Sequence, residues 1–476
     1  MWLVTTFLLM AVTQTHADYP SLQAVLSQKG LQKVSHWVTD WFQNELGKIT
    51  LPEVRGSVDI FVGSVYYVLH DMHVVRCDLP EPSVAFSEGT GVSLQVNGLS
   101  LAISGRWNTE FGIIHDGGSF DLAIYTINFN TLLGFQSTEE HLSISTLMCT
   151  ADVEGIQVNF HGGGSFIFQP FVEKFSGRIK NMIQERICPG FQEGIENIDK
   201  DLAASDYIKM DPYVYLNVSL TDSPVVFNNG FELYIKGEFY SLSFPSEPPF
   251  APNHFELPWK ADYMLSVGMS EFCVNSAAFA YLNSGVLNIT ITNDMIPKAS
   301  PIHLNTSQFG SLIPQLPKMY PDMEMEVVLY ASDTPLISFN QTVINVNLPA
   351  SAKFYAVKTH TDLIPLFRLD MQCSFNAKVH IDNQLLKGVL EMKNLTIVLG
   401  STEIGKFDIA PFQSIVKLAL NSFILPKMNA QLKEGLPLPL MKGFTLNNSV
   451  MTIENGFLVV ATDINSPFDF LQSDKL

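Results

Sequence analysis

Residues 92–103 read Val-Ser-Leu-Gln-Val-Asn-Gly-Leu-Ser-Leu-Ala-Ile, with apolar residues at alternate positions on both sides of Asn97-Gly98. Alternation with period two places successive side chains on opposite faces of a β-strand, so each strand buries one face. The Asn-Gly pair is typical of a tight hairpin turn. The stretch therefore predicts antiparallel β-structure, with a turn at Asn97-Gly98.

The same alternation recurs in both halves of the chain. It predicts strands around Phe120, Leu122 and Ile124, around Leu287, Ile289 and Ile291, and around Leu395, Ile397 and Leu399. A further turn is expected at Asp116-Gly117-Gly118.

Apolar residues at three- and four-residue spacing predict four helices. These run from Leu22 to Leu46, ending at Gly47 and Pro52; from Phe171 to Ile187, ending at Cys188-Pro189-Gly190; from Tyr263 to Leu282; and from Phe412 to Phe423, with a stop or kink at Pro426. Each half thus holds two helices and several strands. The fold class is α+β, antiparallel β-structure with packed helices, repeated twice.

The composition combines a large apolar fraction with few charges. The chain is 46% hydrophobic and 16% charged, yet beyond residue 17 it has no uncharged apolar run of 18 residues such as a membrane helix needs. The apolar surface must lie inside a water-soluble fold, as packed core or as the lining of a cavity for an apolar ligand. This composition favours lipid handling over catalysis.

The charge balance excludes one class of partner. The formal charge is −19, which argues against a nucleic-acid partner. The acidic excess is heaviest in residues 18–240, which hold 27 Asp and Glu against 13 Lys and Arg.

The N-terminus and the sequons indicate export. Residues 1–17 carry no charged side chain and place Thr15 and Ala17 at the minus three and minus one positions, which predicts a secretory signal peptide and a secreted, extracellular protein. A buried N-terminal strand is the alternative. Six N-glycosylation sequons fit export, at Asn217, Asn288, Asn305, Asn340, Asn394 and Asn447.

A proline-rich stretch divides the mature chain. Residues 244–252 contain four prolines, which remove backbone donors and favour extended conformations. We expect a linker at 241–260 between an N-terminal barrel domain, 18–240, and a C-terminal barrel domain, 261–476.

Catalytic motifs are incomplete. His161-Gly162-Gly163-Gly164 is similar to the oxyanion-hole loop of some esterases, but the sequence lacks a Gly-x-Ser-x-Gly elbow, so a glycine-rich strand end is the simpler interpretation. Glu139-Glu140 and Asp199-Lys200-Asp201 could pair as acid and base, although adjacent charges usually face solvent. No His or Cys spacing fits a zinc or redox site. We predict that the protein is not an enzyme and has no metal or cofactor.

Six short segments, spread over the chain from residue 29 to residue 440, can be compared with known proteins: Lys29-Gly30-Leu31-Gln32; Lys48-Ile49-Thr50-Leu51-Pro52; Gly105-Arg106-Trp107; Arg186-Ile187-Cys188-Pro189; residues 288–297, Asn-Ile-Thr-Ile-Thr-Asn-Asp-Met-Ile-Pro; and residues 434–440, Glu-Gly-Leu-Pro-Leu-Pro-Leu. Together they resemble the family of bactericidal permeability-increasing protein and lipopolysaccharide-binding protein. Phospholipid transfer protein and cholesteryl ester transfer protein are more distant members.

The resemblance implies an elongated boomerang of two similar antiparallel β-barrels, each with packed helices, joined by a central antiparallel sheet. Each barrel would hold a bound phospholipid in an apolar pocket. The resemblance also implies a disulfide between Cys149 and Cys188, which leaves Cys77, Cys273 and Cys373 unpaired and buried.

The pocket-lining candidates are apolar residues on the two predicted helices of the first barrel: Leu22, Val25, Leu26, Phe175, Ile179 and Ile183. Ordinary core packing is the alternative for each of them, because periodicity does not distinguish lining from core.

One segment departs from the family pattern. In endotoxin-binding members, lysines and arginines follow the Trp that matches Trp107 and meet the phosphates of lipid A. Here residues 108–116 contain no Lys or Arg and two acids, and carboxylates repel phosphate.

The leading hypothesis is a secreted, monomeric lipid-binding protein of innate immunity that takes phospholipid or lipopolysaccharide acyl chains and contacts a membrane or bacterial surface. A lipid-transfer, matrix or barrier protein of the same fold without endotoxin recognition is the alternative. A secreted hydrolase is a distant third.

Overall fold

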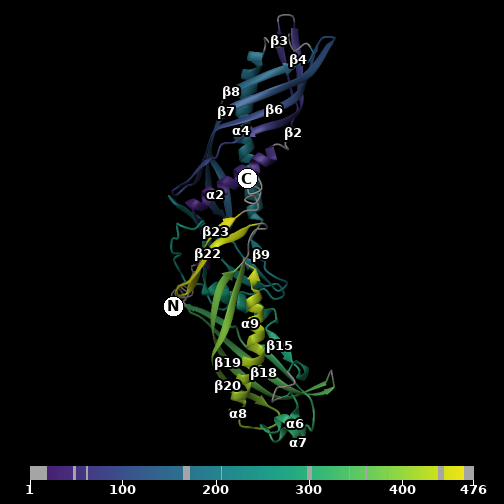
Figure 1. The fold of residues 1–476 in the computed structure, drawn as a ribbon, viewed down its shortest axis with the longest axis vertical. Helices are drawn as coiled ribbons and strands as arrows, with labels where there is room; N and C mark the ends of the chain where they lie inside the picture. Colours follow the sequence, from purple (N-terminus) through teal and green to yellow (C-terminus); the bar gives the residue numbers. More distant parts are fainter. Residues whose placement is uncertain are drawn as a thin grey trace, which may run out of the picture.

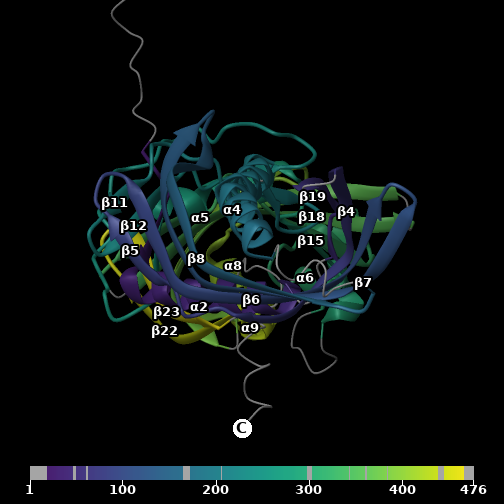
Figure 2. The same cartoon turned by 90° about the horizontal axis from the view of Figure 1, so that it is seen from above.

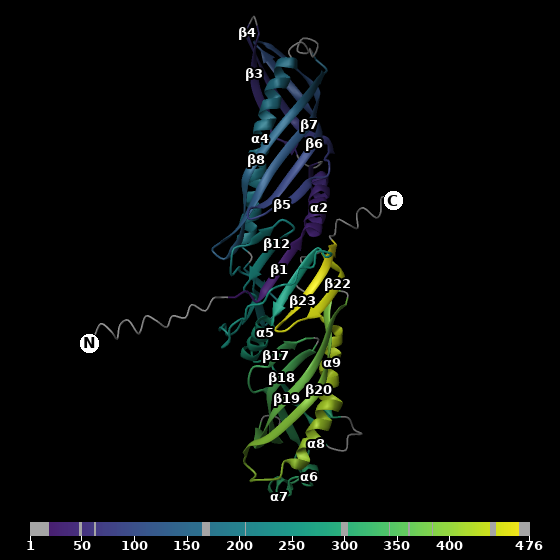
Figure 3. The same ribbon diagram turned by 90° about the vertical axis from the view of Figure 1, so that its left-hand side faces the viewer.

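The computed structural model is elongated, with a curled sheet and a long helical segment at each end and a shared sheet between them (Figure 1 and Figure 3). It describes residues 19–46, 50–60, 63–163, 172–204, 206–296, 303–341, 343–359, 362–382, 384–437 and 444–465. The predicted signal peptide, 1–17, lies outside the described residues.

The N-terminal barrel is one antiparallel sheet that curls around a helix. Its described strands are β2 (Thr50–Leu51), β3 (Val54–Ile60), β4 (Gly63–Asp78), β5 (Ser83–Ser87), β6 (Gly91–Phe111), β7 (Ile114–Thr138) and β8 (His141–His161). They pair in the order β2-β4-β6-β7-β8, with β3 on β4 and β5 on β6. Figure 2 shows the long strands curving around α4 (Val172–Ala203).

The middle of the molecule is a sheet to which both halves contribute. Its order is β11-β12-β1-β14-β23-β22, formed by β11 (Val225–Phe227), β12 (Gly230–Ile235), β1 (Leu22–Ser27), β14 (Leu265–Ser270), β23 (Phe457–Asn465) and β22 (Thr445–Ile453). A smaller sheet beside it contains β13 (Glu238–Ser241), β10 (Val214–Asn217) and β9 (Tyr207–Lys209). Helices α2 (Gln28–Leu46) and α5 (Glu271–Asn283) follow directly from β1 and β14.

The C-terminal barrel repeats the plan. Its sheet runs β15-β16-β18-β19-β20-β21, with β17 on β18. The strands are β15 (Asn288–Ile291), β16 (Met325–Ala331), β17 (Leu336–Asn340), β18 (Val343–Thr359), β19 (Asp362–Asp382), β20 (Leu385–Thr402) and β21 (Leu436–Pro437). Its helices are the short η2 (Asn293–Met295), α6 (Thr306–Phe309) and α7 (Leu316–Met319), and the consecutive α8 (Ala410–Ala419), η3 (Leu420–Ile424) and α9 (Leu425–Glu434). These layers give the α+β fold that was expected.

Two predicted helices begin as strands, which corrects the interpretation of residues 22–46 and 263–282. Residues 22–27 form β1 and residues 265–270 form β14, and the two strands pair with each other. Polar side chains can be buried in β1 because they find partners: the Gln23 amide donates to the Phe255 carbonyl at 2.8 Å and accepts from the Leu257 N–H at 3.1 Å. Because such long-range hydrogen bonds let polar residues occupy the buried face of β1, its sequence does not show the alternation of apolar and polar residues that indicates a strand.

One predicted helix end is also wrong, because α4 continues through Pro189 to Ala203. At Pro426 the structure excludes a stop, since the helical course through α8, η3 and α9 continues to Glu434. Pro426 lies in the first turn of α9, directly after the π-helical segment η3, where the regular α-helical hydrogen-bond pattern is already interrupted. On both sides of Pro189 the helix is fixed to β8, as described below.

The two predicted turns lie inside strands. Gly98 is a bulge in β6: its φ is +81°, the pairing with β7 shifts between Val96 and Leu99, and its N–H donates to the Asn128 side chain at 3.1 Å. Gly118 lies within β7, and glycine is needed there because a Cβ would be 2.0 Å from the His161 carbonyl oxygen. The actual β6–β7 turn is at Gly112–Ile113.

Residues 242–264 form no helix or strand. The predicted linker, 241–260, lies almost entirely in this segment. The domain division stays a prediction, because β1 and β14 come from opposite sides of the linker and share one sheet. Among the described helices, none combines the length and apolar character that crossing a bilayer requires.

Candidate functional site

The interior of the N-terminal barrel is a cluster of inward-facing apolar side chains. Val153 is fully buried, Phe120 is 1% exposed and Trp107 is 2% exposed. Other apolar side chains pack against this cluster but stay half-buried, and we call them the N-terminal rim: Leu99, Leu101, Ile156, Phe160, Ile183 and Ile187. The rim comes from β6, β8 and α4, so sheet and helix both contribute apolar surface to the inside.

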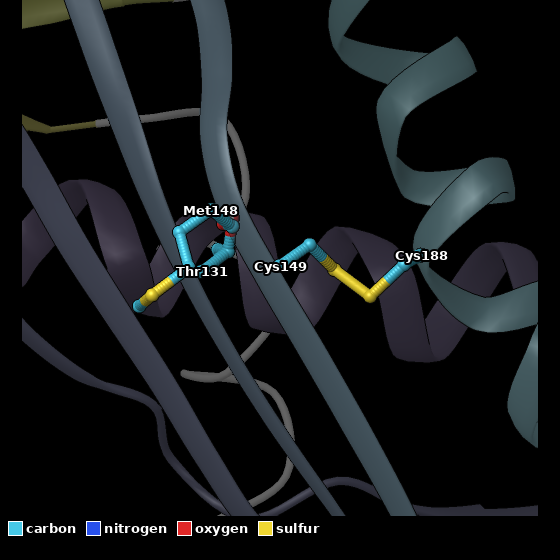
Figure 4. Close-up of a disulfide and its surroundings, with 4 residues drawn as sticks. All are labelled: Thr131, Met148, Cys149 and Cys188. Atoms are coloured by element: carbon cyan, nitrogen blue, oxygen red, sulfur yellow. A yellow bond between two sulfur atoms is a disulfide. The ribbon is translucent and has the colours of Figure 1, made fainter.

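Helix α4 is fixed to β8 at several points along its length. Lys180 donates to the Glu154 carbonyl at 3.3 Å, and the Val153 N–H donates to the Gln184 side chain at 3.4 Å. Cys188 then forms a disulfide with Cys149, with Cα atoms 5.8 Å apart (Figure 4). The spacing of four residues places these groups on one helix face.

Further hydrogen bonds support both partners of that contact. Beside the disulfide, the Thr131 hydroxyl donates to the Met148 carbonyl at 2.9 Å and ties β7 to β8 (Figure 4). Beyond Pro189, the Asp199 carboxylate accepts the Ile144 N–H at 2.8 Å. The helix therefore covers the last strand of the sheet order and holds the barrel curled.

The interior of the C-terminal barrel is a larger cluster built around phenylalanine rings. Phe412 of α8 is 1% exposed, and its ring centroid lies 6.1 Å from that of Phe309, 6.0 Å from Phe367 and 5.6 Å from Phe407. Half-buried apolar side chains pack against this cluster and form the C-terminal rim: Leu390, Met392, Leu395, Leu399, Val416, Ile424 and Leu425. The rim follows β20 and the α8–η3–α9 segment.

A polar contact fixes the second helix to its strand. The Asn429 side chain in α9 accepts the Leu390 N–H at 2.8 Å and donates to the Leu390 carbonyl at 3.0 Å. It thereby satisfies both backbone groups of one residue in β20, as a neighbouring strand would. The two barrels share one arrangement, a helix joined to a strand above an apolar interior.

Comparison with known proteins gives the same assignment for both halves. The family model described as LBP / BPI / CETP family, N-terminal domain, matches residues 30–198, and the model of the C-terminal domain matches residues 208–466. The chain belongs to the LBP/BPI/CETP family.

Two curated relatives illustrate this membership. Bactericidal permeability-increasing protein from Sebastes schlegelii is 31% identical over 461 residues, which covers 96% of this chain and 98% of the relative. Lipopolysaccharide-binding protein from Homo sapiens is 25% identical over 467 residues, 97% of each protein. The crystal structure of a lipopolysaccharide binding protein shares the fold, with a TM-score of 0.58 and 23% identity, and covers 94% of this chain and 99% of the solved chain.

Within this family fold, the six predicted pocket residues do not form one set. Leu22 and Leu26 lie on one face of β1, whereas Val25 lies on the opposite face, so the three cannot line one cavity. None of them is on a helix. Ile183 belongs to the N-terminal rim. Phe175 and Ile179 belong to α4, but their side chains lie outside the described residues.

The C-terminal rim was missing from the predicted site. Its residues show the same periodicities as ordinary core, and the alternation at Leu395 and Leu399 indicated only a strand. Incomplete burial distinguishes them, and burial depends on the packed structure.

The candidate catalytic groups His161, Glu139 and Glu140 are exposed. His161 Nε2 lies 3.0 Å from the Asp121 carboxylate on the surface. Gly164 lies outside the described residues. Glu139 and Glu140 form the β7–β8 turn, where both have positive φ. Among the described residues there is no cluster of three or more potential metal ligands.

The cysteines outside the disulfide are free thiols. Burial raises the pKa of Cys273 to about 12 and that of Cys373 to about 11. Both are buried, whereas Cys77 is only half-buried, which corrects that part of the expectation. Burial, with a smaller contribution from Asp78, raises the Cys77 pKa. These three residues therefore favour the thiol form, which is a poor nucleophile.

The sequons differ in accessibility. Asn217 is 7% exposed and its side chain accepts the Ser219 N–H at 2.9 Å, so the folded protein offers no room for a sugar there. Asn305 is half-buried. The exposed sequons all lie in the second half, at Asn288, Asn340, Asn394 and Asn447.

Proposed function

We propose that the protein is a secreted lipid-binding protein of innate immunity that holds acyl chains of phospholipid or bacterial lipopolysaccharide, one lipid in each barrel. The observation that carries this proposal is the pair of rims: apolar side chains that face each interior and are only half-buried. Completing their burial with a ligand hydrocarbon gains about 0.8 kcal/mol per CH₂. Family membership and the names of the relatives support the same function.

In this proposal the protein acts as a monomer, contacts a membrane or bacterial surface and needs no cofactor other than the bound phospholipid. It has no catalytic role. Acyl chains lie against the rims and head groups stay near solvent, because burying an unpaired phosphate costs far more than burying a methylene gains.

Extraction tests lipid binding directly. We expect protein purified from secreting cells to release phospholipid into organic solvent in stoichiometric amount, measured by mass spectrometry. Ile183→Arg and Leu395→Arg each place a charge in one rim and should each remove about half of that lipid. Val398→Arg is the control, because Val398 is 53% exposed on the outer face of the same strand as Leu395. Wild-type protein without lipid that also fails to take up added phospholipid would refute the proposal.

Titration with lipid A tests the lipopolysaccharide part. Because residues 108–116 contain no Lys or Arg, we expect any affinity to come from acyl chains and to change little with salt. No saturable binding at low salt would restrict the protein to phospholipid.

A further inference from the structure

A pocket of about 380 Å³ lies on the outer face of the C-terminal barrel, beside the end of α5. In β16, Val327 is buried in the C-terminal cluster, so Val328 lies on the opposite face of the sheet. In β18, the same holds for Phe354 and Lys353. The pocket is therefore separate from the C-terminal rim. Its lining combines aliphatic, aromatic and polar side chains: Leu287, Asn288, Val328, Tyr330, Lys353 and Tyr355.

The end of α5 brings a sequon to this pocket. Gly285 ends the helix at φ +72°, and its N–H donates to the Leu282 carbonyl at 2.9 Å. Glycine is favoured in this left-handed conformation, from which the chain turns into β15. The first residue of β15 is Asn288, which begins the sequon Asn288-Ile289-Thr290. In the described sheet order β15 is the outermost strand, with β16 on one side.

The Asn288 side chain is held against the helix end. Its amide donates to the Gly285 carbonyl at 2.6 Å, and the residue is exposed. The amide nitrogen carries two hydrogens, and attachment of a sugar replaces one of them. A glycosylated Asn288 therefore keeps a hydrogen for Gly285, and its first sugar starts from an atom that lines the pocket.

Tyr330 provides a surface for that sugar. It is directly opposite Asn288 in the register of β15 and β16, so the two side chains lie on the same face of the sheet. The negative face of an aromatic ring attracts C–H groups, which one side of a sugar ring presents. Lys353 Nζ lies 5.3 Å from the centre of the Tyr330 ring. Its three N–H donors match the hydroxyl and N-acetyl oxygens of a sugar.

Another exposed sequon provides a comparison within the same barrel. Asn394 lies in β20, which β19 separates from β18 and from the pocket. Asn394 is exposed and does not line the pocket. A glycan on Asn394 therefore lacks the contacts that are available to a glycan on Asn288.

We propose that the pocket binds the first N-acetylglucosamine units of an N-linked glycan on Asn288, so that this glycan lies against the barrel. The apolar side of the sugar packs on Tyr330, and its oxygens accept hydrogen bonds from Lys353. The bound glycan covers the outer edge of β15, and uncovered strand edges pair with other chains. This inference goes beyond the proposed function and shares only secretion with it, because glycan addition requires export.

Glycan release from the folded, full-length protein tests the proposal. Protein from secreting cells would be treated with a peptide N-glycosidase without denaturant, and release at each site followed by peptide mass spectrometry. The enzyme reaches a bound glycan only while it is detached from the pocket. We therefore expect release at Asn288 to be at least about tenfold slower than at Asn394.

A pair of variants distinguishes binding in the pocket from general crowding around Asn288. Tyr330→Ser removes the ring and should speed release at Asn288 about tenfold, without changing release at Asn394. Tyr330→Phe keeps the ring and should behave as the wild type. Thermal unfolding verifies that both variants fold.

Hydrogen exchange gives an independent measurement. Thr290→Ala removes the sequon and should raise exchange in residues 282–291, whereas Thr290→Ser keeps the sequon and should not. Thr396→Ala removes the sequon at Asn394 and should leave exchange in residues 282–291 unchanged.

Four results would overturn the proposal: an unmodified Asn288 in the secreted protein, equal release at Asn288 and Asn394, slow release that Tyr330→Ser does not change, or exchange that Thr290→Ala does not raise. The extracted lipid content separates this inference from the proposed function. A freely released glycan on protein that contains phospholipid refutes only the sugar site. A slowly released glycan on protein that neither contains nor takes up lipid refutes only the proposed function.

Discussion

The N-terminal barrel fixes its helix to the sheet with a covalent bond, whereas the C-terminal barrel uses one amide side chain and a cluster of phenylalanine rings. Cys188 in α4 is bonded to Cys149 in β8, and Asn429 in α9 hydrogen bonds both backbone groups of Leu390 in β20. Phe412 lies at the centre of the larger C-terminal cluster. The N-terminal barrel thus has the smaller apolar cluster and the stronger link between helix and sheet, the disulfide.

The largest effect should follow removal of the covalent link. Cys149→Ser/Cys188→Ser opens a loop with a sequence separation of 39 and should cost about 4 kcal/mol in the chain-entropy model. Hydrogen exchange should rise in α4 and β8 and stay unchanged in β20 and α9. Cys77→Ser, which breaks no disulfide, is the control. Uniform loss of protection in both barrels would show that they are not held separately.

The matching change in the C-terminal barrel should have a smaller effect. Asn429→Leu leaves the Leu390 N–H and carbonyl without their partner and should cost about 2 kcal/mol. Exchange should rise in β20 and α9 only. Asn421→Leu alters an exposed residue of the same helical course and should have no such effect. Unchanged exchange at Leu390 in Asn429→Leu would contradict the role given to this amide.

The junction between the halves should respond more weakly. The Asp463 carboxylate accepts from Lys29 Nζ at 2.8 Å and from the Met264 N–H at 3.2 Å. Because the Lys29 side chain is 44% exposed, solvent screens the pair, and Asp463→Asn should cost about 1 kcal/mol.

A double-mutant cycle with Lys29→Met measures the pair itself. The two changes together should cost less than the sum of their separate effects, in thermal unfolding at low salt. Strict additivity would mean that Lys29 and Asp463 do not interact across the junction.

The smallest effect is a pH dependence. Burial raises the pKa of Glu238, which is 4% exposed, so the folded protein binds this proton more tightly than the unfolded chain does. Stability should therefore fall as pH rises from the ordinary glutamate range through the raised pKa. Glu238→Gln should remove that fall and gain less than about 1 kcal/mol at neutral pH.

Asp382 gives the opposite case. A hydrogen bond from Lys387 at 2.7 Å lowers its pKa, so its contribution to stability is lost as pH falls through the lowered value. Asp382→Asn should flatten the acid side of the stability profile. The same sign for both variants would contradict the account of their surroundings.

The sequence predicts those structural features that depend on local residue patterns better than those that depend on partners far away in the chain. Leu395, Ile397 and Leu399 alternate in sequence and lie in a strand, and Phe412 and Val416 are four residues apart and lie in a helix. Both patterns could be predicted because each of these elements buries one face, and the spacing of its apolar residues follows from that. The family resemblance carried the overall plan and the disulfide.

Features that depend on distant partners were missed. Strand β1 pairs with β12 and β14, both more than 200 residues away, and nothing between Leu22 and Ser27 encodes those neighbours. Its counterpart β14, which also leads straight into a helix, was missed in the same way. Of the candidate pocket residues, Ile183 belongs to the N-terminal rim. Leu22 and Val25 lie on opposite faces of β1, a strand in a segment that was predicted to be helical.

Photo-crosslinking tests most directly whether the barrels hold lipid. A phospholipid with a photoreactive group at the end of one acyl chain would be loaded into the full-length protein, crosslinked and located by peptide mass spectrometry. We predict crosslinks to rim residues of both barrels, in β6, β8 and α4 and in β20, α8 and α9. Crosslinks confined to outward-facing positions such as Val398, with none in either rim, would contradict the account.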